Sequence, residues 1–220
     1  GTESAHLLRL ADGALVPVRS FEEADGRQEW YTPWGEPTEV RSIAVDRGGG
    51  IYVNVHVGGV VRSEDGGRSW KPTLDIETDV HQVVAHPTRA GFVLVAAAVG
   101  FGVSRDGGDS WSFQTEGLHA TYLRAVAIAG NTALVTASTG PGSRRNAIYR
   151  KTLDRDEPFE RCREGLPEWF GENIDTDCLA ASGSAVAFGA RDAVFRSADS
   201  GGRWELAAKG LSPVQCVTIE

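Results

Sequence analysis

The chain has 220 residues, and its 30 acidic side chains against 22 basic ones give a net charge of −8. This acidity argues against a nucleic-acid partner, because neutralising phosphates requires a basic face. Its 41% of hydrophobic and 24% of charged residues are ordinary for a globular domain of this length. The longest apolar run, residues 92–99, is too short to cross a bilayer, so we expect no membrane partner.

The chain has three cysteines, Cys162, Cys178 and Cys216. This number is too small for a disulfide scaffold, and because it is odd the cysteines cannot all pair within the chain. We interpret them as small apolar residues in a reducing compartment, which favours the cytoplasm. A secreted protein is the alternative, because Gly1 is typical of a processed N terminus. No motif calls for a cofactor, and we expect none.

The first predicted elements are the two strands of an outer hairpin, residues 6–10 and 14–18. Four sets of four short strands follow, with glycine-rich turns between the strands. Most of these strands are continuous apolar runs, which suit strands buried on both faces between neighbouring sheets. A last strand is expected over residues 214–219. The four sets span residues 40–72, 80–113, 123–161 and 178–207.

The motif Ser-x-Asp-x-Gly-x-x-Trp occurs three times, each time at the turn before the fourth strand of a set. An aspartate in such a turn can accept bonds from backbone N–H groups, and glycine tolerates a positive φ. The tryptophan then opens the next strand and packs between sheets. We therefore predict a structural role for the motif. Its residues are Ser63, Asp65, Gly67, Trp70, Ser104, Asp106, Gly108, Trp111, Ser197, Asp199, Gly201 and Trp204.

Two weaker copies extend the repeat. Phe159 stands in for the tryptophan of the third set, and Arg9 and Asp12 keep the spacing of Arg62 and Asp65. The copies recur every 40 to 50 residues or so, a period typical of propeller blades.

The repeated motif resembles the Asp-box of the sialidase-like, BNR-repeat superfamily of bacterial type. The resemblance implies an all-β fold, a β-propeller of four-stranded antiparallel blades, as a single domain over residues 1–220. The four sets plus one composite blade predict five blades. In the composite blade the N-terminal hairpin would meet the C-terminal strand, which would remove free sheet edges.

Alignment of the innermost strands predicts a ring of polar side chains at one mouth of the channel: Arg41, His81, Arg124, Asp177 and Gln215. Burying such groups is costly unless they are paired. Two interpretations are open. The residues could satisfy one another, with Asp177 paired to an arginine. Alternatively, Arg41 and Arg124 could hold a small anionic or sugar-like ligand, supported by His81 and Asp177.

His56 and Trp34 extend this predicted ligand-binding set, since both belong to segments that should reach the same mouth. The leading hypothesis is a binding module in which catalysis is not evident, and whether the protein is an enzyme stays open. A protein-interaction scaffold that uses the aromatic segments 30–34 and 169–170 is a further alternative.

A glycoside hydrolase or lyase is the other alternative, because carboxylates at the mouth could act as acid and base. The candidates for catalysis are Glu39, Asp79, Tyr122 and Asp177. The Arg-Ile-Pro element and the third arginine that the sialidase resemblance would imply are missing, which puts that activity in doubt.

His56, His81 and His119 could supply nitrogen ligands to a metal ion. These histidines have no short metal-binding spacing, and we therefore expect no metal.

Overall fold

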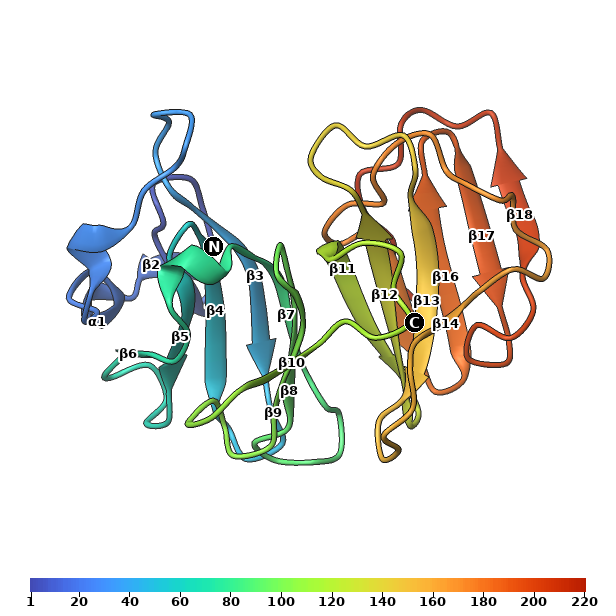
Figure 1. Ribbon diagram of the computed structural model, residues 1–220. Coiled ribbons are helices and arrows are strands. Elements are labelled where there is room, and N and C mark those ends of the chain that lie inside the picture. Colours follow the sequence, from blue (N-terminus) through green and yellow to red (C-terminus); the bar gives the residue numbers. More distant parts are fainter. The chain divides into compact units, whose positions relative to one another are not determined.

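The computed structural model describes all residues, Gly1–Glu220. They form two compact units: the first is Gly1–Val95 with Gly102–Ser112, and the second is Ala96–Phe101 with Phe113–Glu220. The chain is all-β apart from short helical turns (Figure 1). No helix has the length and apolar character needed to cross a membrane.

The strands form four four-stranded sheets and one two-stranded sheet, and within each sheet consecutive strands are neighbours. This up-and-down order is that of propeller blades. The first unit opens with the hairpin β1 (Leu8–Ala11) and β2 (Ala14–Pro17), α1 (Arg19–Glu22) and the turn η1 (Arg27–Glu29). The first sheet comprises β3 (Glu39–Val45), β4 (Ile51–His56), β5 (Gly59–Ser63) and β6 (Lys71–Pro72), and the turn η2 (Ile76–Thr78) follows it.

The three other sheets repeat the same plan. The second comprises β7 (Val80–Ala85), β8 (Val93–Ala97), β9 (Gly100–Ser104) and β10 (Ser112–Gln114). The third comprises β11 (Tyr122–Ala129), β12 (Thr132–Ser138), β13 (Ala147–Thr152) and β14 (Glu160–Arg161). The fourth comprises β15 (Leu179–Ser182), β16 (Ala185–Ala190), β17 (Ala193–Ser197) and β18 (Glu205–Lys209).

The second strand is deeply buried in the first three blades. Every residue of β8 is buried, and β4 and β12 are buried except for their first residue. Such strands are covered on both faces, which explains why they are apolar without alternation. The predicted sets of strands are therefore confirmed, with ends that differ by one or two residues.

The first repeated turn shows how the Ser-x-Asp-x-Gly-x-x-Trp motif holds a blade together. Asp65 Oδ1 accepts bonds from the Ser63 hydroxyl at 2.8 Å and from the Ser69 N–H at 2.9 Å. Ser63 Oγ accepts the Gly67 N–H at 2.8 Å. Trp70 follows and is buried against Phe21 and the strands of the first sheet. Asp106 and Asp199 make equivalent bonds in their turns.

A second repeat, Glu-Gly-Leu, follows the fourth strand of two blades. The Glu164 carbonyl accepts the Trp204 N–H at 2.9 Å, and the Glu116 carbonyl accepts the Phe159 N–H at 2.8 Å. Phe159 therefore occupies the place of Trp204, as predicted. Gly165 has a positive φ, and a Cβ there would overlap the carbonyl oxygen of Trp204. The Glu-Gly-Leu triplet thus hydrogen-bonds, through its glutamate carbonyl, to the backbone of the aromatic residue in the following blade.

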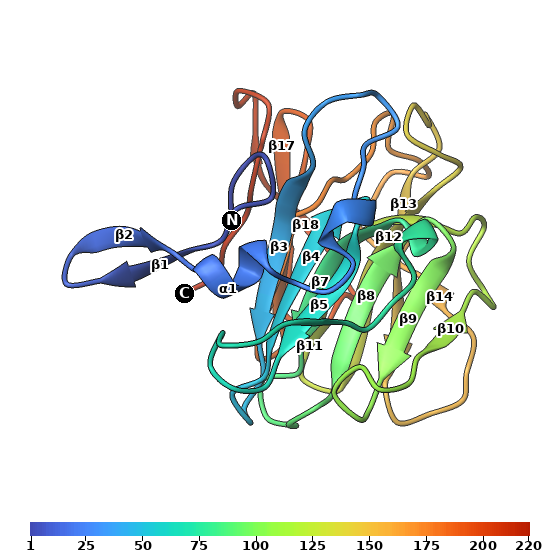
Figure 2. The same ribbon diagram turned by 90° about the vertical axis from the view of Figure 1, so that its left-hand side faces the viewer.

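The expected C-terminal strand over residues 214–219 does not form. The Val214 N–H donates to the Arg191 carbonyl at 2.7 Å, and the Val217 N–H donates to the Asp177 carbonyl at 2.8 Å. These bonds place the segment against the fourth blade, without strand pairing. The hairpin β1–β2 stays two-stranded and projects from the first unit beside α1 (Figure 2). The composite blade that we expected from these two segments therefore needs correcting.

Candidate functional site

A polar cluster lies at the start of the innermost strand of the first blade. The register of β3 with β4 shifts between Val40 and Ser42, so Arg41 is an extra, bulged residue. A bulge re-aims a side chain and is common beside functional sites. Arg41 Nε donates to Glu39 Oε1 at 2.9 Å, and its side chain is 17% exposed. The buried Nη1 of Arg41 has no hydrogen-bond partner.

Two histidines and an aspartate complete this cluster, which we call the Arg41 cluster (Glu39, Arg41, His56, Asp79 and His81). His56 ends β4, while Asp79 and His81 stand at the entry to β7, which lies next to β3. Asp79 Oδ1 is 3.6 Å from His56 Nε2, and Asp79 Oδ2 is 3.5 Å from His81 Nε2. The carboxylate thus lies between the two rings.

The electrostatics of the cluster favour a neutral His56 and an ionised Asp79. Burial and the nearby charge of Arg41 lower the pKa of His56 to about 4. The interaction with His81, supported by the charge of Arg41, holds the pKa of Asp79 below its usual range, although burial opposes this. At neutral pH the cluster therefore presents a buried guanidinium group beside an uncharged imidazole.

A second polar cluster occupies the same position in the third blade, within the second unit. Arg124 Nε donates to Asp175 Oδ1 at 2.6 Å, and Arg124 Nη1 donates to the Tyr122 hydroxyl at 3.2 Å. The side chain of Arg124 is 21% exposed. Burial opposes its charge, but Asp175 and Tyr122 outweigh burial and raise its pKa.

The three remaining predicted binding residues are Asp177, Gln215 and Trp34. The carboxylate bound to Arg124 is Asp175, so the expected pairing of Asp177 with an arginine was wrong for Arg124. Gln215 is exposed, and its amide donates to the Pro213 carbonyl at 3.4 Å. Trp34 is 74% exposed.

The predicted catalytic carboxylates differ in their surroundings. Glu39 is ion-paired with Arg41. The pKa of Asp79 is lowered, so Asp79 is not poised as a general acid. Asp177 is exposed, but partial desolvation raises its pKa, and this is the direction that a general acid requires. Tyr122 bonds to Arg124. No group of three or more His, Cys, Asp or Glu side chains has an arrangement that could hold a metal ion.

Sequence analysis missed two buried polar residues that support these clusters. Asn54 Nδ2 donates to the Val80 carbonyl at 2.8 Å, at the entry to β7. Thr136 Oγ1 accepts the Ala125 N–H and donates to the Ile174 carbonyl, both at 3.0 Å. Each residue lies opposite the bulge of its blade. A polar residue in the middle of a mostly apolar, buried strand was the available signal.

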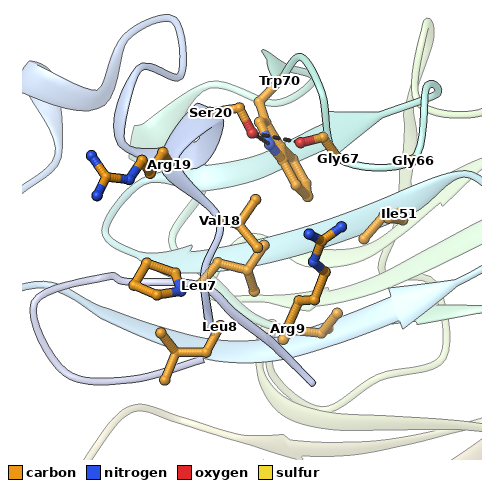
Figure 3. A pocket seen from close by; sticks show the side chains of 12 residues that line it. Leu7, Leu8, Arg9, Val18, Arg19, Ser20, Ile51, Gly66, Gly67 and Trp70 are labelled. Atoms are coloured by element: carbon orange, nitrogen blue, oxygen red, sulfur yellow. Dashed lines mark hydrogen bonds between the residues drawn. The ribbon is translucent and has the colours of Figure 1, made fainter. Parts of the chain in front are cut away.

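The first unit also has a cavity of about 360 Å³ between the base of the hairpin β1–β2 and the Trp70 turn. Figure 3 shows the ring of Trp70 with Val18 and Leu7 around it. The Ser20 hydroxyl donates to the Gly67 carbonyl at 2.5 Å and accepts from the Trp70 indole at 3.3 Å. The lining is mainly apolar, and its titratable groups are two arginines, so this cavity has less chemistry to offer than the Arg41 cluster.

No protein-family model matches the chain, and no curated protein matches it. Solved structures do match. The GH74 xyloglucanase from Xanthomonas campestris is 17% identical with a TM-score of 0.58, over 76% of this chain and 29% of that chain. The Niastella koreensis GH74 enzyme is 14% identical with a TM-score of 0.63, over 91% and 34%. The RRP9 WD40 repeats are 16% identical with a TM-score of 0.59, over 82% and 57%.

The chain therefore spans about a quarter to a third of the length of the GH74 structures. At such identities the likeness concerns the fold alone. The matches and the meander order of the strands identify the fold as an all-β propeller. Its five sheets are those of a five-bladed propeller in which four blades have four strands and the fifth is reduced to the hairpin β1–β2.

Proposed function

We propose that the protein is a sialidase-like Asp-box propeller that binds a small anionic or sugar-like ligand through the Arg41 cluster. The observation that carries the proposal is the buried Nη1 of Arg41, which has no partner although the rest of the guanidinium group is ion-paired. A buried donor without a partner is costly, and a carboxylate oxygen would satisfy it.

The neighbouring groups support this choice of ligand. His56 is uncharged at neutral pH, and when an anion binds it can take up a proton, so that both ring nitrogens become donors. Asp79 and Glu39 limit the positive potential, so the cluster suits a ligand with one acidic group and hydroxyl groups rather than a polyphosphate. Within the second unit, Arg124 at the equivalent position of its blade is proposed as a binding residue in its own right, together with Asp177 and Gln215.

The Asp-box assignment rests on the geometry of the three turns. Each places a serine hydroxyl and an aspartate carboxylate on the same side of a tight turn, with a tryptophan following. These aspartates are fully engaged in holding the turn, which supports a structural role.

Thermal unfolding against uronic acids, small organic acids and neutral sugars tests the proposal. A ligand at about 100 times its dissociation constant adds roughly 2.7 kcal/mol of stability, which raises the midpoint by a few degrees. We expect an acidic compound to shift wild type but not Arg41→Ala. The matched control is Arg68→Ala, an exposed arginine in a turn. A shift that persists in Arg41→Ala would place the ligand elsewhere, and the absence of any shift would contradict the proposal.

A further inference from the structure

Trp169 is stacked against two arginines of the second unit. The Cζ atom of Arg161 is 3.8 Å from the centroid of the Trp169 ring, and that of Arg145 is 4.5 Å from it. Arg161 ends β14, and Arg145 lies in the loop between β12 and β13. A guanidinium group stacked on an aromatic face is held in place while its in-plane N–H donors stay available.

These arginines belong to a group of four that have no carboxylate partner: Arg144, Arg145, Arg161 and Arg163. The second unit holds six other arginines, and each of those pairs with an aspartate or glutamate. In a chain with a net charge of −8, four unneutralised arginines in two short segments form a local positive surface.

His119 contacts both Arg145 and Trp169 of the stack, and Tyr149 in turn hydrogen-bonds to His119. His119 Nε2 donates to the Arg145 carbonyl at 3.1 Å, and His119 Nδ1 accepts from the Tyr149 hydroxyl at 2.9 Å. The His119 ring lies 4.8 Å from that of Trp169. Burial and the charges of Arg161 and Arg145 lower the pKa of His119, in agreement with the positive surface. The arrangement is therefore ordered before any partner arrives.

Trp169 also lines a cavity of about 300 Å³ on the fourth blade. Phe170, Phe195 and Leu206 contribute to its apolar part, and Leu206 is 51% exposed. Its charged lining residues, Glu172 and Asp192 against Arg191 and Lys209, balance one another. The cavity thus offers space for an apolar side chain beside the arginines.

We propose that this surface, the Arg145–Trp169–Arg161 stack with its adjoining cavity, binds an extended acidic segment of a partner protein. Two carboxylates of the segment pair with the stacked guanidinium groups, and an apolar side chain enters the cavity beside Trp169. The unpaired positive charge of the arginines favours an acidic partner segment. The apolar cavity favours a peptide over a nucleic acid or a free anion. The proposal uses residues other than the Arg41 cluster and does not depend on it.

Fluorescence anisotropy with a labelled peptide of alternating glutamate and leucine tests the proposal. The comparison probes are the glutamate–serine and lysine–leucine peptides and a single-stranded oligothymidylate of equal length. The test variant is Arg145→Gln/Arg161→Gln. The control is Arg155→Gln/Arg196→Gln, which removes the same charge from two exposed arginines that are ion-paired. Leu206→Glu tests the cavity, and since Leu206 is half-exposed this change should leave the fold intact.

We expect the glutamate–leucine peptide to bind wild type and the control alike, and the test variant to bind it roughly tenfold more weakly. Added salt should weaken binding, and the glutamate–serine peptide and Leu206→Glu should each show reduced affinity. Equal binding by the test variant and the control would overturn the proposal. So would tighter binding of the oligothymidylate than of the peptide, or no binding of the peptide at all.

Discussion

Arg41 and Arg124 occupy the same position in two different blades. Each lies at a register irregularity in the innermost strand, one residue after a paired position: Val40 opposite Val55 in the first blade and Leu123 opposite Ala137 in the third. The equivalence extends to the bound groups, because each arginine contacts the side chain two residues before it. The repeat thus places a guanidinium group at a defined point, and the surrounding residues decide what it binds.

Replacement of Asn54 should weaken the first unit. Asn54 is fully buried, and its amide donates to the Val80 carbonyl at 2.8 Å. Asn54→Ala leaves that carbonyl without this donor, which we expect to cost about 1–3 kcal/mol of the free energy of unfolding. Urea denaturation measures the effect, with the exposed Gln215→Ala as control. Equal midpoints for Asn54→Ala and wild type would show that the bond is unimportant.

The two glycines Gly165 and Gly210 form a matched pair. Both have a φ near +80°, at +80° and +78°. A Cβ on Gly165 would overlap the Trp204 carbonyl oxygen, whereas a Cβ on Gly210 meets nothing within 4 Å. Gly210→Ala should cost only the backbone strain, about 1–2 kcal/mol. Gly165→Ala should cost more, about 3 kcal/mol or above, because the blade contact must open. Similar losses in denaturation would contradict this explanation.

The lowered pKa of His56 has a consequence for ligand binding. An imidazole whose folded pKa is about 4 is neutral between that value and its unfolded pKa of 6.5. In the free protein the depressed pKa of His56 therefore lowers the free energy of unfolding as pH falls through this window. A bound anion should raise the pKa of His56, so binding takes up a proton and tightens as pH falls toward the free-protein value of about 4. Calorimetry in buffers of different ionisation enthalpy measures the uptake, and affinity that is independent of pH would contradict it.

The three cysteines should differ in reactivity. Burial raises the pKa of both Cys162 and Cys178 to about 11, whereas Cys216 is exposed. A thiol reagent at neutral pH should therefore modify Cys216 first, with the other two reacting only on unfolding. Mass spectrometry of the native protein after brief labelling, with Cys216→Ser as control, would show this. Rapid labelling of Cys162 would indicate that the blade around it opens.

The blades and the arginine positions could be predicted from the sequence because both follow from repetition. Continuous apolar strands and three copies of one turn align the innermost strands without ambiguity, and Arg41 and Arg124 fall at one aligned position. Asp79 and His56 could be named because they flank the same strand ends.

Long loops and chain ends could not be predicted in this way. Asp175 comes from a loop without periodicity, so nothing in the sequence favoured it over Asp177 as the partner of Arg124. Residues 214–219 are mostly apolar, as a strand would be, but their N–H groups find carbonyls at Asp177 and Arg191 instead of a neighbouring strand. Local pattern indicates the capacity for a strand, whereas pairing depends on which backbone groups lie nearby.

Nuclear magnetic resonance can show whether the free donor of Arg41 binds an acidic group. The Nε–Hε signal of Arg41 and the ring signals of His56 would be followed in wild-type protein during titration with a uronic acid and with its neutral sugar. Assignment would use Arg41→Lys. We expect the acid, and not the neutral sugar, to shift the Arg41 signal and to raise the pKa of His56. Unchanged Arg41 and His56 signals at saturating acid would contradict it.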